Sequence, residues 1–317
     1  MTRKVRFLQE AFVPLVTPFR NGAVDDSLYA KLIERQIAEG SHGLLVNATS
    51  GEPTTLSFEE KARLIEIAVK VSASRRPVVA GTPAESHAET VALMARAERA
   101  GADAIVAVTP AYVKPPQRGL VAYFVDLAGR TKLPFLIYHI PGRAAVNLTA
   151  ETIEAIAARA PNFVGLKNTD DNLALVTRLL ATLGPDFRNF GGMESSAFAM
   201  SAIGGCGTMI TSSNVAPRQI AQIHDRFAAG DVAGAGALTR ELHELMDATS
   251  YDTSPIQVKY MMKRLGVLPA NEHRLPMVPA TPELEKRLDG VLERAGLPTG
   301  SPRAVRAASG RRAGSRR

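Results

Sequence analysis

The chain has 317 residues, of which 45% are hydrophobic and 22% are charged, proportions typical of a soluble globular protein. It has no run of about 18 uncharged apolar residues, so we expect no membrane span, and its first residues lack the apolar core of a signal peptide. A single cysteine, Cys206, excludes an intramolecular disulfide and a cysteine-based metal site. We read Cys206 as a buried inert thiol and expect a cytoplasmic protein.

The net charge of +7 comes mainly from the end of the chain. Six arginines and no acidic residue lie after residue 297, and removing them from +7 leaves +1 for the rest. We expect this Gly/Ser/Ala/Arg segment to be disordered, because it has too few apolar residues to fold. Weak binding of RNA or DNA through phosphates is the alternative, but we do not expect nucleic acid to be a partner in the main function.

Apolar runs of strand length alternate with amphipathic runs of helix length. Strands are predicted at 12–16, 43–47, 77–81, 104–108, 134–138, 163–167, 187–191 and 208–212. The helices that follow them are predicted at 25–39, 57–73, 86–100, 117–130, 149–159, 171–182, 194–203 and 216–229. The strands are apolar at most positions, as in parallel strands covered on both faces. Eight such units predict an α/β fold of the (β/α)8 TIM barrel type.

A small helical extension follows the barrel, with helices predicted at 231–249, 255–265 and 281–294. We therefore divide the chain into a barrel with the catalytic site (1–230), a C-terminal helical region (231–297) and a disordered basic tail (298–317). A doubly wound sheet is the alternative architecture. Such a sheet normally carries a phosphate-binding loop between a strand and a helix, whereas the glycine-rich run at 204–207 precedes a strand.

Polar residues gather at the predicted carboxyl ends of the strands, where barrel enzymes carry their chemistry. Lys167 ends the sixth strand and Tyr138 the fifth, while Thr49 and Ser50 follow the second strand and Arg143 the fifth. Burial disfavours the charged form of a lysine, and a neutral amine can add to a ketone and form an iminium. Spacing alone leaves open a solvent-facing lysine, a core tyrosine, a simple turn and a surface arginine.

The six histidines are scattered and form no pair at helical i,i+4 spacing, so we expect no metal site. We expect no cofactor either. His139 follows Tyr138, and the alternation of side chains along a strand predicts that it points away from the barrel centre, in a structural role.

The motifs at the strand ends resemble those of the dihydrodipicolinate synthase / N-acetylneuraminate lyase family of pyruvate-dependent aldolases. The resemblance covers roughly residues 10–295. It is carried by Leu15-Val16-Thr17-Pro18-Phe19, Ala48-Thr49-Ser50-Gly51-Glu52, Pro110-Ala111-Tyr112, Tyr138-His139-Ile140-Pro141-Gly142-Arg143 and Gly165-Leu166-Lys167. It implies a homotetrameric barrel in which Lys167 forms the Schiff base and Tyr138 shuttles protons.

The resemblance also implies roles for the neighbouring residues. Thr49 and Ser50 would bind the pyruvate carboxylate and relay protons, and Tyr112 would complete the relay from a neighbouring subunit. Arg143 matches the arginine that holds the carboxylate of the aldehyde in the synthase branch. We also place Met209 among the substrate-binding residues.

The chain departs from the family pattern at several positions. Ala48 replaces a glycine of the motif after the second strand, and His139 replaces the usual asparagine. Phe58, Glu85 and Ala111 differ from the residues that the family carries at its lysine feedback site. The last three departures predict that lysine does not inhibit the protein.

The leading functional hypothesis is a cofactor-free class I aldolase or lyase that condenses pyruvate with a second carbonyl compound, aspartate semialdehyde. The first alternative is a catabolic relative that acts on a sugar-derived or aromatic 2-oxo acid through the same iminium. The alternative from another class is a barrel that has lost catalysis and serves as a binding protein. The expected partners are thus small-molecule substrates and further copies of the chain.

Overall fold

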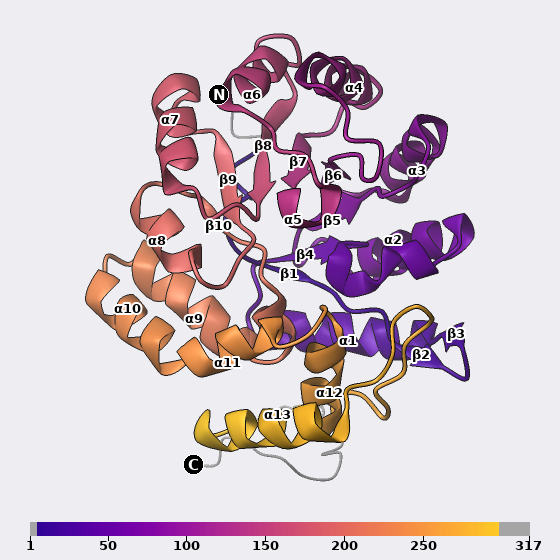
Figure 1. The fold of residues 1–317 in the computed structure, drawn as a ribbon, viewed down its shortest axis with the longest axis vertical. Helices are drawn as coiled ribbons and strands as arrows, with labels where there is room; N and C mark the ends of the chain where they lie inside the picture. The colour runs from indigo at the N-terminus through magenta and orange to yellow at the C-terminus, as the bar shows by residue number, and fades with distance from the viewer. Residues whose placement is uncertain (1–4, 298–317) are drawn as a thin grey trace, which may run out of the picture.

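The protein is a closed eight-stranded parallel barrel surrounded by helices (Figure 1). The computed structural model describes residues 5–297, so the predictions for the basic tail lie outside the described residues. Around the barrel the strands follow the order β1-β10-β9-β8-β7-β6-β5-β4. They are β1 (Glu10–Pro14), β4 (Gly43–Val46), β5 (Val78–Gly81), β6 (Ala104–Val108), β7 (Phe135–His139), β8 (Phe163–Asn168), β9 (Arg188–Gly191) and β10 (Gly207–Thr208). The (β/α)8 prediction is confirmed.

Each barrel strand is followed by a helix that packs on its outer face. These helices are α1 (Asp26–Ala38), α2 (Phe58–Ser72), α3 (His87–Ala100), α4 (Gln117–Gly129), α6 (Ala150–Ala157), α7 (Leu173–Leu183), α8 (Ala197–Ala202) and α9 (Pro217–Ala228). Several begin at the caps visible in the sequence. Ser57 and Glu60, for example, form a complete capping box at α2, with each side chain bonded to the backbone N–H of the other.

Side chains alternate between the barrel interior and the helix layer, as parallel strands require. On β7, Leu136 and Tyr138 belong to the interior cluster, whereas Ile137 belongs to the cluster under the helices. On β8, Leu166 packs under the helices, so Lys167 points inward. The inward-facing polar side chains at the carboxyl ends of β7 and β8 therefore lie at the mouth of the barrel, where its apolar interior ends.

The last barrel strand and a short hairpin near the N-terminus both differ from the predictions. The last barrel strand covers only Gly207–Thr208, because the chain turns into the 3-10 segment η4 (Thr211–Asn214), whose first amides bond to Glu194. A hairpin of β2 (Phe19–Arg20) and β3 (Ala23–Val24) was not predicted. Its turn is Asn21-Gly22, two residues with positive φ, which is the pair that a tight hairpin turn prefers.

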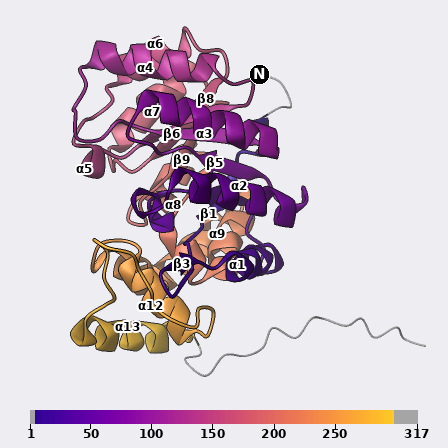
Figure 2. The same ribbon diagram turned by 90° about the vertical axis from the view of Figure 1, so that its right-hand side faces the viewer.

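The C-terminal helices pack against the barrel beside α1 and α9 (Figure 2). They are α10 (Val232–Glu241), α11 (His243–Asp247), α12 (Ile256–Arg264) and α13 (Pro282–Arg294), so the helix predicted at 231–249 is divided near Leu242. One hydrophobic cluster contains residues of α9 and of these four helices, so it has members on both sides of residue 230. The domain boundary at that residue stays a prediction. No helix within residues 5–297 is both long enough and apolar enough to cross a membrane.

Candidate active site

Lys167 and Tyr138 face each other at the mouth of the barrel. They are paired in register on the adjacent strands β8 and β7, and both point inward. The Nζ atom of Lys167 lies 4.1 Å from the centroid of the Tyr138 ring. Lys167 is 3% exposed and Tyr138 7%. The barrel register therefore holds an amine and a phenol together in a largely water-free place, where proton transfer between them and a bound molecule is feasible.

Thr49 joins this pair from the turn after β4. It begins a 3-10 turn, η2 (Thr49–Gly51), and its Oγ1 lies 3.1 Å from the hydroxyl of Tyr138. The turn is fixed from below, because the hydroxyl of Thr17 donates a 2.7 Å hydrogen bond to the carbonyl of Gly51. In the segment Leu15–Phe19, the side chain of Thr17 thus stabilises the turn that carries Thr49.

Ser50 is buried beside Thr49 but bonds in another direction. Its Oγ lies 3.3 Å from Oγ1 of Thr211, on η4. The backbone N–H groups of Thr211 and Ser212 donate to Oε1 of Glu194 at 2.9 and 3.1 Å. Burial raises the pKa of Glu194 above its usual value. Glu194 therefore holds the segment that carries the hydroxyl partner of Ser50.

Glu194 and Thr211 were missed at the level of the sequence. Glu194 stands three residues after β9 and Thr211 three residues after β10, which are the same strand-end positions that disclosed the other site residues. Inspection of the end of the seventh strand in the same way would have found Glu194, whereas Thr211 lies inside the strand predicted at 208–212.

His139 points away from the barrel centre, as alternation predicts. It is fully buried, and its Nδ1 lies 3.0 Å from Oδ1 of Asn168, the residue after Lys167. Its Nε2 accepts a hydrogen bond of 3.2 Å from the backbone N–H of Leu148. Nε2 also lies 2.7 Å from Oδ1 of Asn147, and burial lowers the pKa of His139 below its usual value. His139 therefore ties the end of β7 to the end of β8.

A cavity of about 210 Å³ opens above these residues. Its walls include Thr49, Glu52, Thr109, Tyr138, Arg143 and Met277. Arg143 is exposed and lies on the short helix α5 (Pro141–Ala144), which was not predicted. The cavity is smaller than the pockets usual for cofactor-sized ligands, so its volume suits a small organic acid. Its lining offers such an acid one cationic side chain, that of Arg143. Lys167 borders this space through the ring of Tyr138 rather than lining it.

Besides Lys167, three predicted site residues do not line this cavity: Ser50, Met209 and Tyr112. Met209 is 1% exposed in the interior cluster that also contains Tyr138. Tyr112 is 95% exposed on the loop between β6 and α4, with its backbone in the left-handed region at a φ of 68°. Within one copy of the chain, Tyr112 lines no part of this cavity.

The described residues also bear on metal binding. Among residues 5–297, no three His, Cys, Asp or Glu side chains are grouped so that they could hold a metal ion. Cys206 is partly buried, and burial raises the pKa of its thiol well above the usual value. The thiol is therefore not activated as a nucleophile at neutral pH.

The chain is similar to known proteins along nearly its whole length. The model of the Dihydrodipicolinate synthetase family matches residues 8–295. The 4-hydroxy-tetrahydrodipicolinate synthase of Rhodospirillum centenum is 41% identical over 289 residues, which cover 91% of this chain and 99% of that protein. The enzyme of the same name from Oleidesulfovibrio alaskensis is 39% identical over 287 residues, which cover 90% and 98%.

A solved structure agrees with these similarities. The crystal structure of dihydrodipicolinate synthase from Aquifex aeolicus aligns with a TM-score of 0.89 at 36% identity and covers 92% of this chain and 99% of that one. Family match, sequence identity and barrel geometry point the same way. The chain belongs to the dihydrodipicolinate synthetase family.

Proposed function

We propose that the protein is a 4-hydroxy-tetrahydrodipicolinate synthase, which condenses pyruvate with aspartate semialdehyde through a Schiff base on Lys167. Its membership of the family and the names of its relatives support this activity. The observation that carries the role of Lys167 is its place beside Tyr138, whose hydroxyl lies 3.1 Å from Thr49. A buried amine beside a hydroxyl pair is the arrangement that imine formation needs.

The chemistry follows from these groups. The amine of Lys167 adds to the ketone of pyruvate, and loss of water gives an iminium. Loss of a proton from C3 then gives an enamine, whose carbon forms a bond to the aldehyde carbon while the aldehyde oxygen takes up a proton. The amino group of the aldehyde substrate finally attacks the iminium, closes the ring and releases Lys167. Tyr138 and Thr49 are placed to carry the protons in these steps.

Recognition of the two carboxylates is assigned to different parts of the cavity. We assign the pyruvate carboxylate to the turn with Thr49 and Ser50, and Met209 to the apolar floor beneath it. Arg143, exposed at the cavity wall, is assigned to the carboxylate of the aldehyde, because a guanidinium can bind a carboxylate with two parallel hydrogen bonds.

The exposure of the Tyr112 side chain supports assembly of several copies of the chain. An aromatic side chain that is 95% exposed on a left-handed backbone residue gains most of its burial from another molecule. We therefore propose a homotetramer in which Tyr112 reaches the relay of a neighbouring copy. Analytical ultracentrifugation of the wild type and of Tyr112→Ala tests this, and a monomeric wild type with full activity would exclude it.

The activity is tested by trapping. Incubation with pyruvate and borohydride, followed by digestion, is expected to leave a reduced pyruvyl adduct on Lys167, and Lys167→Arg should give none. Turnover with aspartate semialdehyde should then exceed turnover with sugar-derived and aromatic 2-oxo acids. An adduct on another residue, or none at all, would refute the proposed chemistry. An adduct on Lys167 together with faster turnover of another substrate would keep the Schiff-base chemistry and change only the assignment of aspartate semialdehyde as the second substrate.

A further inference from the structure

The turn that carries Thr49 and Ser50 is flanked by two non-glycine residues with left-handed backbone. The φ angle is 56° at Asn47 and 54° at Glu52. Side-chain-bearing residues occupy this region mainly where surrounding contacts hold them there. At Asn47 the contact is local, because its amide donates a 3.0 Å hydrogen bond to the carbonyl of Lys61 on α2. At Glu52 the backbone bonds locally to Thr49 and Thr55, whereas the partners of the side chain come from the other end of the chain.

Both oxygens of the Glu52 carboxylate have partners from the C-terminal part of the chain. Oε1 accepts a hydrogen bond of 2.8 Å from Nζ of Lys259 on α12, and Oε2 lies 3.2 Å from Nδ1 of His273. The side chains of Glu52 and Lys259 are each 1% exposed, and that of His273 is fully buried. Because each oxygen has its own directed partner, the carboxylate is held in one orientation.

Lys259 is in turn held from several sides. Its Nζ donates to the carbonyl of Glu272 at 2.5 Å and lies 4.5 Å from the centroid of the Phe19 ring. Burial lowers the pKa of Lys259, and the negative charge of Glu52 opposes that effect. Nε2 of His273 lies 2.9 Å from Oδ1 of Asn271, so the imidazole is fixed at both nitrogens.

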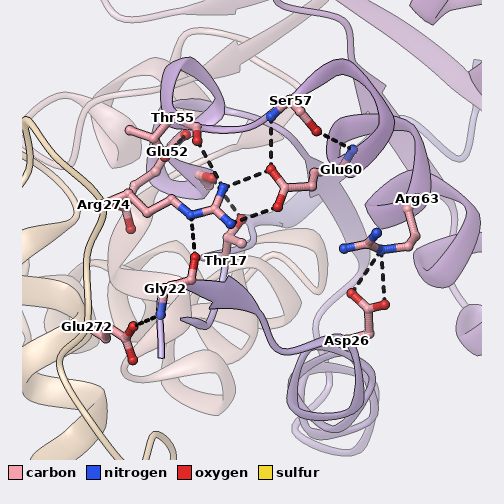
Figure 3. A network of polar contacts seen from close by, with 11 residues as sticks. Thr17, Gly22, Asp26, Glu52, Thr55, Ser57, Glu60, Arg63, Glu272 and Arg274 are labelled. Carbon is pink, nitrogen blue, oxygen red and sulfur yellow. Dashed lines mark hydrogen bonds and ion pairs between the residues drawn. The ribbon is translucent and has the colours of Figure 1, made fainter. Parts of the chain in front are cut away.

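The segment that carries His273 is fastened to the barrel by the next residue (Figure 3). The guanidinium of Arg274 donates two hydrogen bonds to the carboxylate of Glu60 on α2, at 2.8 and 2.7 Å. It also donates to the carbonyls of Thr55, at 3.1 Å, and Gly22, at 2.8 Å. These four bonds span the β2–β3 hairpin, the loop after the turn, and α2. The position of His273 is thereby set by bonds other than its own contact with Glu52.

The same C-terminal region reaches the cavity. Ser254 and Met277 line it together with Thr49 and Glu52. The turn with Thr49 and Ser50 is thus held by the same C-terminal region that forms part of the cavity wall.

We propose that Glu52, Lys259 and His273 are positioning residues, through which the C-terminal region sets the hydroxyls of Thr49 and Ser50 for the pyruvate carboxylate. This inference rests on the proposed function, since it assigns pyruvate to that turn. A buried ion pair is by itself a poor source of stability, because apolar residues of similar volume can often replace it without loss. Apolar residues cannot, however, orient a carboxylate on a left-handed residue two positions after Ser50.

The test is a double variant, Glu52→Gln with Lys259→Met, which removes both charges together and leaves neither unpaired. The control is Arg264→Met with Asp289→Asn, which removes an ion pair of 2.7 Å that starts from the same helix α12 and leads to α13. For both variants and the wild type, melting temperature and borohydride trapping of Lys167 are measured over a range of pyruvate concentrations.

The expected result is a rise of about tenfold or more in the pyruvate concentration that half-saturates trapping in the Glu52/Lys259 variant, because small misplacements of binding groups have effects of this size. Trapping at saturating pyruvate should persist, and the control should behave like the wild type. A folded Glu52/Lys259 variant with wild-type half-saturation would overturn the inference.

A second variant covers the case in which the double variant aggregates. His273→Leu keeps the ion pair and removes the partner of Oε2, and it should raise the half-saturating concentration in the same direction; an unchanged value overturns the inference. If the wild type itself gives no adduct, the proposed function fails and the inference falls with it. That outcome differs from failure of the inference alone, where the wild type is trapped normally.

Discussion

Replacement of Tyr138 by phenylalanine tests the proton shuttle while preserving the surroundings of Lys167. The aromatic ring that lies 4.1 Å from Nζ of Lys167 stays in place, and only the hydroxyl that faces Thr49 at 3.1 Å is lost. The loss removes one proton-transfer group and one hydrogen bond, but no packing. General acid–base groups of this kind contribute roughly 100- to 10,000-fold to rate. We expect kcat to fall by about 100-fold or more, which corresponds to about 3 kcal/mol or more of transition-state stabilisation.

Two assays separate the steps that Tyr138 serves. Turnover with aspartate semialdehyde reports the whole reaction, and exchange of the C3 protons of pyruvate in D2O, followed by NMR without the aldehyde, reports imine and enamine formation alone. Both should slow in Tyr138→Phe. Thr49→Val, which removes the hydroxyl on the other side of the same 3.1 Å contact, should slow both assays as well, because Thr49 belongs to the same relay. If Tyr138→Phe retains kcat within about threefold of the wild type, the shuttle role is refuted, since that change is far below the usual contribution of such a group.

Three further outcomes are expected. Arg143→Met should raise KM for aspartate semialdehyde by about 10- to 100-fold, as loss of a charged hydrogen bond does, and should leave the half-saturating pyruvate concentration unchanged in the trapping assay; equal effects on both substrates would contradict the assignment. Burial lowers the pKa of His224 from 6.5 to about 4, so the stability that its neutral form contributes is complete above pH 6.5 and is lost as the pH falls towards 4, by about 3 kcal/mol. As the pH falls over that interval, the melting temperature of His224→Gln should decrease less steeply than that of the wild type. Titration with lysine should leave turnover unchanged up to millimolar concentrations, because Phe58, Glu85 and Ala111 depart from the residues that the family pattern has at its lysine feedback site; submillimolar inhibition would contradict this.

The barrel could be predicted because its signals are local. Each strand shows an apolar run and each helix an amphipathic one, and the predicted bounds differ from the observed ones by a few residues. The first strand, for example, shifts from 12–16 to 10–14. Its predicted end leaves the sheet because the N–H of Val16 turns to the side chain of Asn214, 198 residues away. Such a contact leaves no trace in the local pattern.

The same distinction applies to the site. Lys167 and Tyr138 could be expected to meet, because each ends a strand and the two strands are neighbours in a barrel. The ion pair of Glu52 with Lys259 joins residues 207 positions apart, and the sequence around Lys259 reads only as one more helix. The turn of the β2–β3 hairpin, in contrast, has a local signal, because Asn-Gly is a pair that favours a tight hairpin turn.

The two halves of the site therefore depend on different kinds of support. Lys167 and Tyr138 are placed by the register of β7 and β8, and any sequence that closes the barrel places them. The turn with Thr49 and Ser50 instead lies between two strained residues, and left-handed backbone at non-glycine positions costs about 1 kcal/mol or more at each. The loop of the barrel bonds only the backbone of Glu52, through Thr49 and Thr55, whereas the partners that direct its carboxylate belong to α12 and the segment after it. Damage to the C-terminal region should accordingly weaken pyruvate binding before it affects the reactivity of Lys167, an order that a fault in the barrel itself would not produce.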